Sequence, residues 1–334
     1  MKYSRTGRFP QIAASRRNKL PIGNVLSPTP TKRAPSQAPF SLHSACRLLQ
    51  QQRVQAFHEG SRVRDLGAFS QQAIHQLLGL KAEPIAHQRF DEVFTALDAG
   101  KIDAAVIPLE NTLAGSVHEN YDLLLKHRCE ITAETSVRVI HNLIAPPGVS
   151  FRALRKVYSH PVALNQCLDF FASHPRIKRT PFYDTAGSVK MIMEERPSDG
   201  AAIASELAAQ TYGAHILKRG IEDDRQNFTR FFLLEPAGAK PRTIRGAAKH
   251  PWKTSLVFSI GNVPGALFRS LGALALRDIN LVKIESRPLR GKPWEYLFYL
   301  DLWGHRDDQV VRNALSHLQE LADFLRVLGS YRAA

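Results

Sequence analysis

Short apolar strands alternate with helical segments from Val54 to Leu234. This alternation predicts right-handed crossovers and mostly parallel strands, with helices on both faces of each sheet. This number of strands is too large for one small sheet. We therefore expect two lobes with a cleft between them. The expected strands are 54–57, 104–107 (ending at Pro108), 137–145, 156–158, 178–183, 201–204 and 227–234, and the expected helices are 70–78 (capped by Ser70), 91–100 (capped by Asp91), 117–126, 161–172, 188–195 and 205–212.

The pattern changes after a stretch rich in Pro, Gly, Ala and basic residues. The expected order beyond it is strand 254–260, helix 264–277, strands 280–287 and 294–303, helix 308–321 and strand 324–331. This βαββαβ order is that of a ferredoxin-like unit, and its size suits a separate domain. We therefore divide the chain into an N-terminal extension (1–52), a two-lobed domain (53–236), a linker (237–251) and a C-terminal domain (252–331).

The formal net charge of +15 is unevenly distributed. Residues 1–58 hold ten Lys or Arg and no Asp or Glu, which leaves 35 basic against 30 acidic residues in the remainder. A nucleic-acid-binding protein would concentrate this charge on its folded part. The distribution therefore argues against a nucleic-acid partner and assigns the basic excess to a tail.

The N-terminal segment 1–52 is rich in Ser, Pro, Arg and Gln and is expected to be disordered. Its acid-free, Arg- and Ser-rich composition resembles an organelle transit peptide, although a dispensable extension or an upstream start codon explains it equally well. No apolar run is long enough to span a bilayer, and the three scattered cysteines form no metal or disulfide pattern. We expect a soluble protein of a reducing compartment, bacterial cytoplasm first and plastid second.

Arg230 interrupts an apolar run within Asn227–Leu234, and Thr229 stands at the start of that run. A guanidinium among phenylalanines is costly to bury unless an anion meets it. On residue types alone, an edge strand whose arginine reaches water is the simpler interpretation. An arginine that faces a bound anion is the alternative.

Four neutral-polar clusters follow predicted strands, where ligands bind in open α/β sheets. Each is explained on its own by helix capping, but together with one arginine they describe a pocket for a small organic anion. None has metal-ligand or nucleotide-loop spacing, so no cofactor and no metal is expected. The clusters are 108–116, Ser159-His160-Pro161 with Gln166, 184–188 and 227–230.

Taken together, these polar clusters and their flanking strands resemble the motifs of the prephenate dehydratase family. The match rests on an ordered set of strings across residues 54–331: Ile107-Pro108-Leu109-Glu110-Asn111-Thr112 with Gly115-Ser116, Tyr158-Ser159-His160-Pro161 with Gln166-Cys167, and Asn227-Phe228-Thr229-Arg230-Phe231. The resemblance implies a two-lobed catalytic domain like that of periplasmic binding proteins, followed by a ferredoxin-like ACT regulatory domain. It also implies a lyase that converts prephenate to phenylpyruvate with loss of water and carbon dioxide, on the route to phenylalanine; close relatives act on arogenate.

By resemblance, Thr229 is the catalytic hydroxyl that assists departure of the ring hydroxyl. The implied substrate-binding residues are Asn111, Thr112, Ser116, Ser159, Gln166, Thr185 and Arg230. Because an isolated threonine is a feeble acid, Thr229 is expected to act as a preorganised donor in a cationic pocket. Two positions depart from the family pattern: the loop 59–66 is several residues too long, and Thr112 stands where many members have serine. A non-catalytic binder of small carboxylates is the competing hypothesis.

The C-terminal domain resembles the ACT module through Gly265-Ala266-Leu267-Phe268 and Glu285-Ser286-Arg287-Pro288. The implied effector is L-phenylalanine, with Gly265, Ala266, Leu267, Glu285 and Ser286 as effector-binding residues. Free backbone N–H groups at the start of a helix suit an amino-acid carboxylate. ACT modules generally pair side by side, so a homodimer or homotetramer is expected.

Overall fold

A computed structural model gives the fold. It describes residues 53–57 (backbone only), 67–87, 89–239, 242, 244, 249–289, 291–292 and 294–334. The N-terminal extension, the whole of the loop 59–66 and part of the linker predicted at 237–251 lie outside these residues. Residues 50–334 form one compact unit, and the description below concerns this unit alone.

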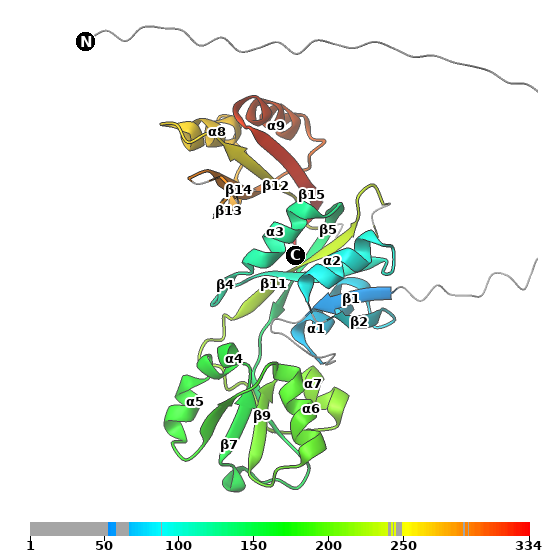
Figure 1. The fold of residues 1–334 in the computed structure, drawn as a ribbon, viewed down its shortest axis with the longest axis vertical. Helices are drawn as coiled ribbons and strands as arrows, with labels where there is room; N and C mark the ends of the chain where they lie inside the picture. The colour runs from blue at the N-terminus through cyan, green and yellow to red at the C-terminus, as the bar shows by residue number, and fades with distance from the viewer. Residues whose placement is uncertain are drawn as a thin grey trace, which may run out of the picture. The chain divides into compact units, whose positions relative to one another are not determined.

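Lobe I is built on a mixed sheet in the order β2-β1-β3-β11-β5, with the short β4 paired to β3 (Figure 1). β1 pairs in parallel with β2 and β3, whereas β11 runs antiparallel to both of its neighbours. β1, β2, β3 and β5 therefore run in one direction, as expected, and the reversed strand β11 lies between β3 and β5. Its strands are β1 (Arg53–Phe57), β2 (Glu83–His87), β3 (Ala104–Asn111), β4 (Gly115–Ser116), β5 (Cys129–Arg138) and β11 (Phe228–Pro236), and its helices are α1 (Phe69–Leu78), α2 (Phe90–Asp98) and α3 (His118–Lys126).

Strand β3 does not end at Pro108, as the sequence predicted, but continues to Asn111. The pairing with β11 shifts so that Phe231 lies opposite Pro108 and Arg230 opposite Glu110, which leaves Leu109 as an extra residue. Proline lacks the N–H that a regular ladder needs and is tolerated at such a bulge. The bulge carries the strand onward, so that Asn111 pairs with Thr229.

Lobe II contains a second mixed sheet in the order β10-β6-β9-β7-β8. Only β9-β7-β8 is parallel, and β6 and β10 are antiparallel additions at one side. Its strands are β6 (Asn142–Ala145), β7 (Lys156–Ser159), β8 (Lys178–Pro181), β9 (Gly200–Ala204) and β10 (His215–Lys218), and its helices are η1 (Phe151–Ala153), α4 (Pro161–Asn165), α5 (Leu168–Ser173), α6 (Thr185–Glu195) and α7 (Glu206–Tyr212).

The chain passes between the lobes twice, from β5 to β6 and from β10 to β11. The strand predicted at 137–145 is divided by the first of these crossovers, Val139–His141. The helix predicted at 161–172 is likewise two helices that meet at Gln166 and Cys167. Both differences place a polar side chain, His141 or Gln166, where the sequence suggested a regular element.

Several predicted helix starts shift by one to three residues. α1 and α2 begin after Ala68 and Arg89, so Ser70 and Asp91 lie inside their first turns rather than at the caps. α6 begins at Thr185, and its cap is Asp184, whose carboxylate accepts from Gly187 N at 2.7 Å. α7 begins at Glu206, and Ser205, predicted as its first residue, is its N-cap and also donates to Gly67 O at 2.6 Å, which joins lobe II to the start of α1.

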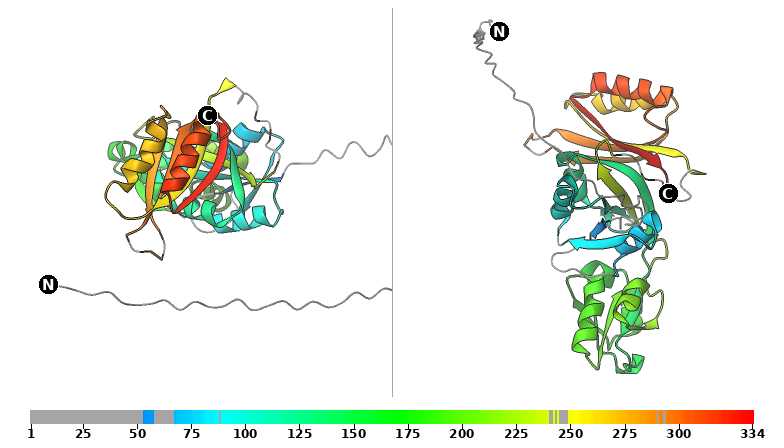
Figure 2. Two further views of the ribbon diagram at one scale, coloured as in Figure 1. Left: turned by 90° about the horizontal axis from the view of Figure 1, so that it is seen from above. Right: turned by 90° about the vertical axis from the view of Figure 1, so that its right-hand side faces the viewer.

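The C-terminal domain has the ferredoxin-like order predicted from the sequence. Its antiparallel sheet, β13-β14-β12-β15, carries α8 and α9 on one face and packs the other against lobe I (Figure 2). Buried side chains of this second face, among them Val257, Tyr299 and Tyr331, share one core with lobe I. The elements are β12 (Trp252–Ile260), α8 (Ala266–Ala275), β13 (Leu281–Pro288), β14 (Tyr296–Trp303), α9 (Gln309–Leu321) and β15 (Phe324–Arg332).

Candidate active site

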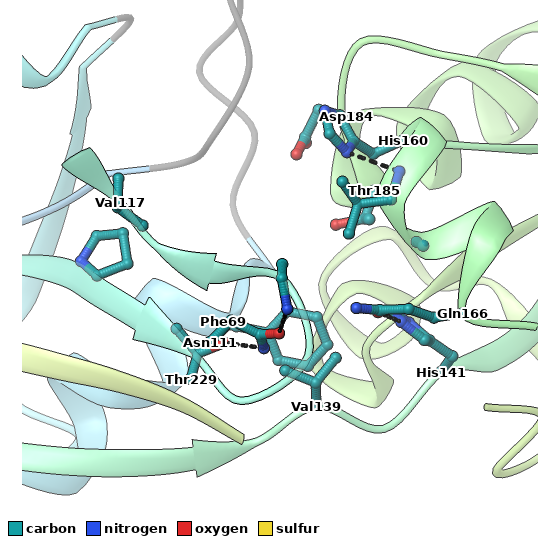
Figure 3. A pocket seen from close by; sticks show the side chains of 14 residues that line it. Phe69, Asn111, Val117, Val139, His141, His160, Gln166, Asp184, Thr185 and Thr229 are labelled. Carbon is teal, nitrogen blue, oxygen red and sulfur yellow. Dashed lines mark hydrogen bonds between the residues drawn. The ribbon is translucent and has the colours of Figure 1, made fainter. Parts of the chain in front are cut away.

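A pocket lies where the two lobes meet at the crossovers (Figure 3). Lobe I contributes the last residues of β3 and the first residues of β11, and lobe II contributes the starts of α4 and α6. The lining residues are Phe69, Pro108, Asn111, Ala114, Val117, Val139, His141, His160, Val162, Ala163, Gln166, Asp184, Thr185 and Thr229. Apart from one carboxylate and two histidines this lining is uncharged, and it contains no Lys or Arg among the described residues.

Asn111 is held in one orientation by the backbone. Its Oδ1 accepts from the N–H groups of Leu113 at 3.0 Å and Ala114 at 2.8 Å. Its Nδ2 is therefore the atom that faces Thr229 Oγ1, at 3.0 Å, and Asn227 Oδ1, at 2.7 Å. An amide in this position can only donate to the threonine oxygen.

This contact sets the direction of the Thr229 hydroxyl. Its oxygen accepts from Asn111, and no described residue accepts its hydrogen. Since the side chain lines the pocket, the hydrogen is available to a bound molecule. The expected role of Thr229 as a preorganised donor is compatible with this geometry, but the cationic pocket expected around it is not found, because the described lining holds no Lys or Arg.

The hydrogen-bond chain continues from Asn227 into lobe II. Asn227 Nδ2 donates to Gln166 Oε1 at 3.0 Å, and His141 Nε2 lies 2.8 Å from the same oxygen. Gln166 Nε2 is thereby left facing the cavity, toward Asn111 and Thr229, as Figure 3 shows. Asn227 belongs to the predicted polar cluster 227–230 but had no role assigned to it, and His141 was not predicted as a site residue.

Burial lowers the pKa of His141, although the hydrogen bond to Gln166 and the nearby Glu222 and Asp223 carboxylates act in the opposite direction. The side chain is 1% exposed. Its ring therefore stays neutral at neutral pH. In sequence it lies inside a run of apolar residues, and no local signal separates it from a core histidine.

The predicted substrate residues divide into two groups. Asn111, Gln166, Thr185 and Thr229 line the pocket together. Thr112, Ser116 and Ser159 do not, and each makes a structural hydrogen bond instead. Thr112 Oγ1 donates to Gln226 O at 2.8 Å, Ser116 Oγ donates to Glu285 Oε2 at 3.0 Å, and Ser159 Oγ donates to Ile203 O at 2.7 Å.

Arg230 also lies outside the pocket, contrary to the expectation that it faces the anion. Successive residues of a strand point to opposite faces, so Thr229 faces the pocket while Arg230 faces the C-terminal domain. Its guanidinium lies 2.5 Å from Glu134 Oε2 and 2.6 Å from Asp301 Oδ2, and donates to Tyr331 Oη at 3.1 Å. The arginine is buried as an ion pair with two carboxylates on a central strand, so the simpler interpretation of an edge strand whose arginine reaches water is wrong as well.

The pKa values in this cluster reflect that pairing. Burial alone would lower the pKa of the Arg230 guanidinium, but Asp301, Tyr331 and Glu134 outweigh it and raise the pKa. Lys253 Nζ lies 2.5 Å from Glu134 Oε1, so two cations and two carboxylates are enclosed together. This charge balance explains why the cluster tolerates burial.

The predicted effector residues lie on two elements of the C-terminal domain. Gly265 is the N-cap of α8, with a φ of 76° that favours glycine, and Ala266 and Leu267 form the first turn. Glu285 and Ser286 lie on β13 and point to opposite faces. Glu285 faces lobe I, where it accepts from Ser116 and lies 3.7 Å from His118 Nδ1.

The described residues contain two cysteines and were also compared with the requirements of a metal site and of a membrane-spanning helix. Cys129 and Cys167 are free and buried, and burial raises the pKa of Cys129 to about 12. No group of three or more His, Cys, Asp or Glu is arranged to hold a metal in the described part of the chain. Within that part, no helix is both long and apolar enough to cross a membrane.

Two α/β lobes joined by two crossovers, with hydroxyl and amide donors converging between them, define a cleft protein for a small polar molecule. Comparison with known proteins identifies the family within this class of cleft proteins. The family model for prephenate dehydratase matches residues 65–239. This chain belongs to the prephenate dehydratase family and is a carbon–oxygen lyase, as its sequence motifs predicted.

Individual relatives agree with the family assignment. Arogenate dehydratase/prephenate dehydratase 2, a chloroplastic protein of Arabidopsis thaliana, is 44% identical over 294 residues, which cover 84% of this chain and 75% of that protein. Arogenate dehydratase 2 of Petunia hybrida is 42% identical over 292 residues, covering 82% and 72%. The crystal structure of a prephenate dehydratase from Arthrobacter aurescens in complex with L-Phe has a TM-score of 0.73 and 31% identity, and the match covers 84% of this chain and 89% of that one.

Proposed function

We propose that this enzyme performs the decarboxylating dehydration that leads to phenylalanine, with arogenate as its preferred substrate and prephenate as the alternative. The observation that carries the reaction type is the Thr229 hydroxyl, which is fixed by Asn111 and directs its hydrogen into the pocket. Membership of a lyase family sets aside the competing hypothesis of a non-catalytic carboxylate binder.

The proposed reaction breaks the bond between the ring and its hydroxyl oxygen. The ring carboxylate leaves as carbon dioxide, and the electron pair of its C–C bond completes the aromatic ring. The departing oxygen takes up one proton and leaves as water. Thr229 donates a hydrogen bond to that oxygen as charge develops on it, and the proton is supplied finally by solvent. Because aromatisation provides the driving force, no group beyond the chain's own donors is required.

Replacement of Thr229 tests this assignment. Thr229→Ala removes the donor and is expected to lower kcat by about 10²–10³-fold, the usual effect of losing one preorganised donor. Thr229→Ser keeps the hydroxyl on a smaller side chain and should retain most of the activity. Turnover is measured by chromatographic quantification of the product, which is phenylalanine from arogenate or phenylpyruvate from prephenate, with circular dichroism as a check on folding. Near-normal activity of the alanine variant would contradict the assignment.

Two observations support arogenate over prephenate. Both plant relatives carry arogenate in their names. Arogenate also has an ammonium group that offsets one of its two carboxylates, whereas prephenate carries two uncompensated charges. The net negative charge of arogenate is therefore lower by one, which suits a pocket whose described lining has no Lys or Arg to balance a second negative charge. A single preparation assayed with both substrates should give the higher kcat/KM with arogenate.

We further propose a plastid location, in place of the bacterial cytoplasm that the sequence first suggested. The support is the chloroplastic Arabidopsis relative together with the basic, acid-free start of the chain. Import of the radiolabelled full-length chain into isolated chloroplasts, with trimming to a smaller protease-protected form, is the expected result. A chain without residues 1–52 should remain outside.

The C-terminal domain is proposed to bind L-phenylalanine and to inhibit the enzyme as an ACT module. The support is the glycine-capped start of α8 and the bacterial relative whose structure was solved in complex with L-Phe. The exposed edge strand β13, with Val282 and Ile284 on its outer face, suits pairing of two subunits into a homodimer or a larger homotetramer. Inhibition assays and light scattering with and without phenylalanine test both points.

A further inference from the structure

His141 has an unusual position for a neutral, buried side chain. It lies on the crossover from β5 to β6 and lines the pocket while remaining 1% exposed. Its Nε2 contacts Gln166 Oε1 at 2.8 Å, and its buried Nδ1 has no hydrogen-bond partner among the described residues. A buried polar atom without a partner needs an explanation.

The protonation of this ring follows from the hydrogen bonds that lead to it. Two backbone N–H groups orient Asn111, and Asn111 orients Asn227. Asn227 in turn presents its NH₂ group to Gln166. Gln166 must therefore present its oxygen to both Asn227 and His141, so His141 carries its proton on Nε2.

We propose that His141 is a positioning residue that holds the Gln166 amide with its NH₂ group directed at the substrate. This inference rests on the proposed function, because it assumes an anionic substrate in the pocket. With only Asn227 on its oxygen, the Gln166 amide would be less firmly held and could present its carbonyl to a carboxylate, which is repulsive. Two donors to one oxygen, one from each crossover, prevent that rotation.

The surroundings of His141 keep it in the neutral form that this role requires. Glu222 Oε2 accepts from the backbone N–H of His141 at 3.0 Å, and Asp223 N donates to Gln166 O at 2.8 Å. The Phe69 ring packs edge-on at 6.2 Å, and Arg138 lies 3.4 Å from Glu222. The Glu222 carboxylate is thus occupied by the backbone and by an arginine, and burial dominates the ring.

Two amide substitutions distinguish positioning from a purely structural role. His141→Gln places a donor near the former Nε2, whereas His141→Asn places one near the former Nδ1, out of reach of Gln166. His141→Asn should raise KM about tenfold with kcat nearly unchanged, which corresponds to about 1.4 kcal/mol of substrate binding. His141→Gln should stay within about twofold of the wild type in both parameters. Equal KM values for the two variants would overturn the proposal.

A second measurement applies even if His141→Asn folds poorly. Histidine ¹⁵N–¹H correlation spectra of the full chain should show a protonated Nε2 and an unprotonated Nδ1 for His141, whatever the substrate proves to be. The opposite tautomer would refute the inference without affecting the proposed function. Absence of wild-type turnover on both substrates would instead refute the proposed function.

Discussion

At the scale of single residues, the neutral His141 links the pocket to stability as well as to binding. Burial lowers its pKa below the ordinary value of 6.5. Near pH 6.5 the unfolded chain therefore binds a proton at His141, whereas the folded chain does not. The stability that neutral His141 contributes is present above that pH and is lost as the pH falls below it. Between about pH 7.5 and about pH 5, the wild type should lose more unfolding free energy than His141→Gln does.

Urea denaturation of both proteins across this pH range measures the difference. His75 and His87 also have pKa values lowered by burial, but they are common to the two proteins and cancel in the comparison. Parallel stability curves for wild type and variant would contradict the assigned protonation state. The sequence could not supply this prediction, because the crossover that buries His141 between two sheets leaves no local pattern.

At the scale of elements, the approach of β15 to β5 depends on one glycine. A Cβ at Gly329 would overlap the backbone carbonyl of Ile131, and backbone atoms cannot move aside as a flexible side chain can. Gly329→Ala should therefore separate the C-terminal sheet from lobe I and lower the melting temperature by several degrees, with a destabilisation of about 1–3 kcal/mol. Gly272→Ala, in the middle of α8 with open space around it, is the matched control and should be neutral or slightly stabilising.

The same scale shows what a sequence pattern can and cannot reveal. The βαββαβ order of the C-terminal domain follows from local periodicity, because each of its elements is regular and separated by turns. The continuation of β3 past Pro108 and the division of 137–145 do not, because a bulge and a crossover depend on pairing partners far along the chain. These two irregularities carry Asn111 and His141 into the pocket.

At the scale of the whole compact unit, adjacent residues of β11 serve opposite faces of lobe I. Thr229 lines the pocket, and Arg230 joins Glu134 of lobe I to Asp301 of the C-terminal domain. The sequence indicated that this arginine needs an anion, but it could not identify two carboxylates 96 and 71 residues away. The family resemblance instead assigned Arg230 to the substrate pocket, where a bound anionic substrate would also satisfy a guanidinium.

This connection predicts a large effect of a single substitution on the cohesion of the unit. Arg230→Met removes the cation and leaves Glu134 and Asp301, which are 6% and 5% exposed, without their shared partner. The loss should be about 3–5 kcal/mol, because Lys253 alone then faces two buried carboxylates and one buried charge is left uncompensated. Arg219→Met removes an arginine 2.7 Å from Glu206, but that pair is exposed to solvent, so the loss of stability should be much smaller. Denaturant unfolding of the two variants compares the same Arg→Met substitution at a buried and at an exposed position. Equal losses of unfolding free energy would show that Arg230 does not hold the C-terminal domain to lobe I.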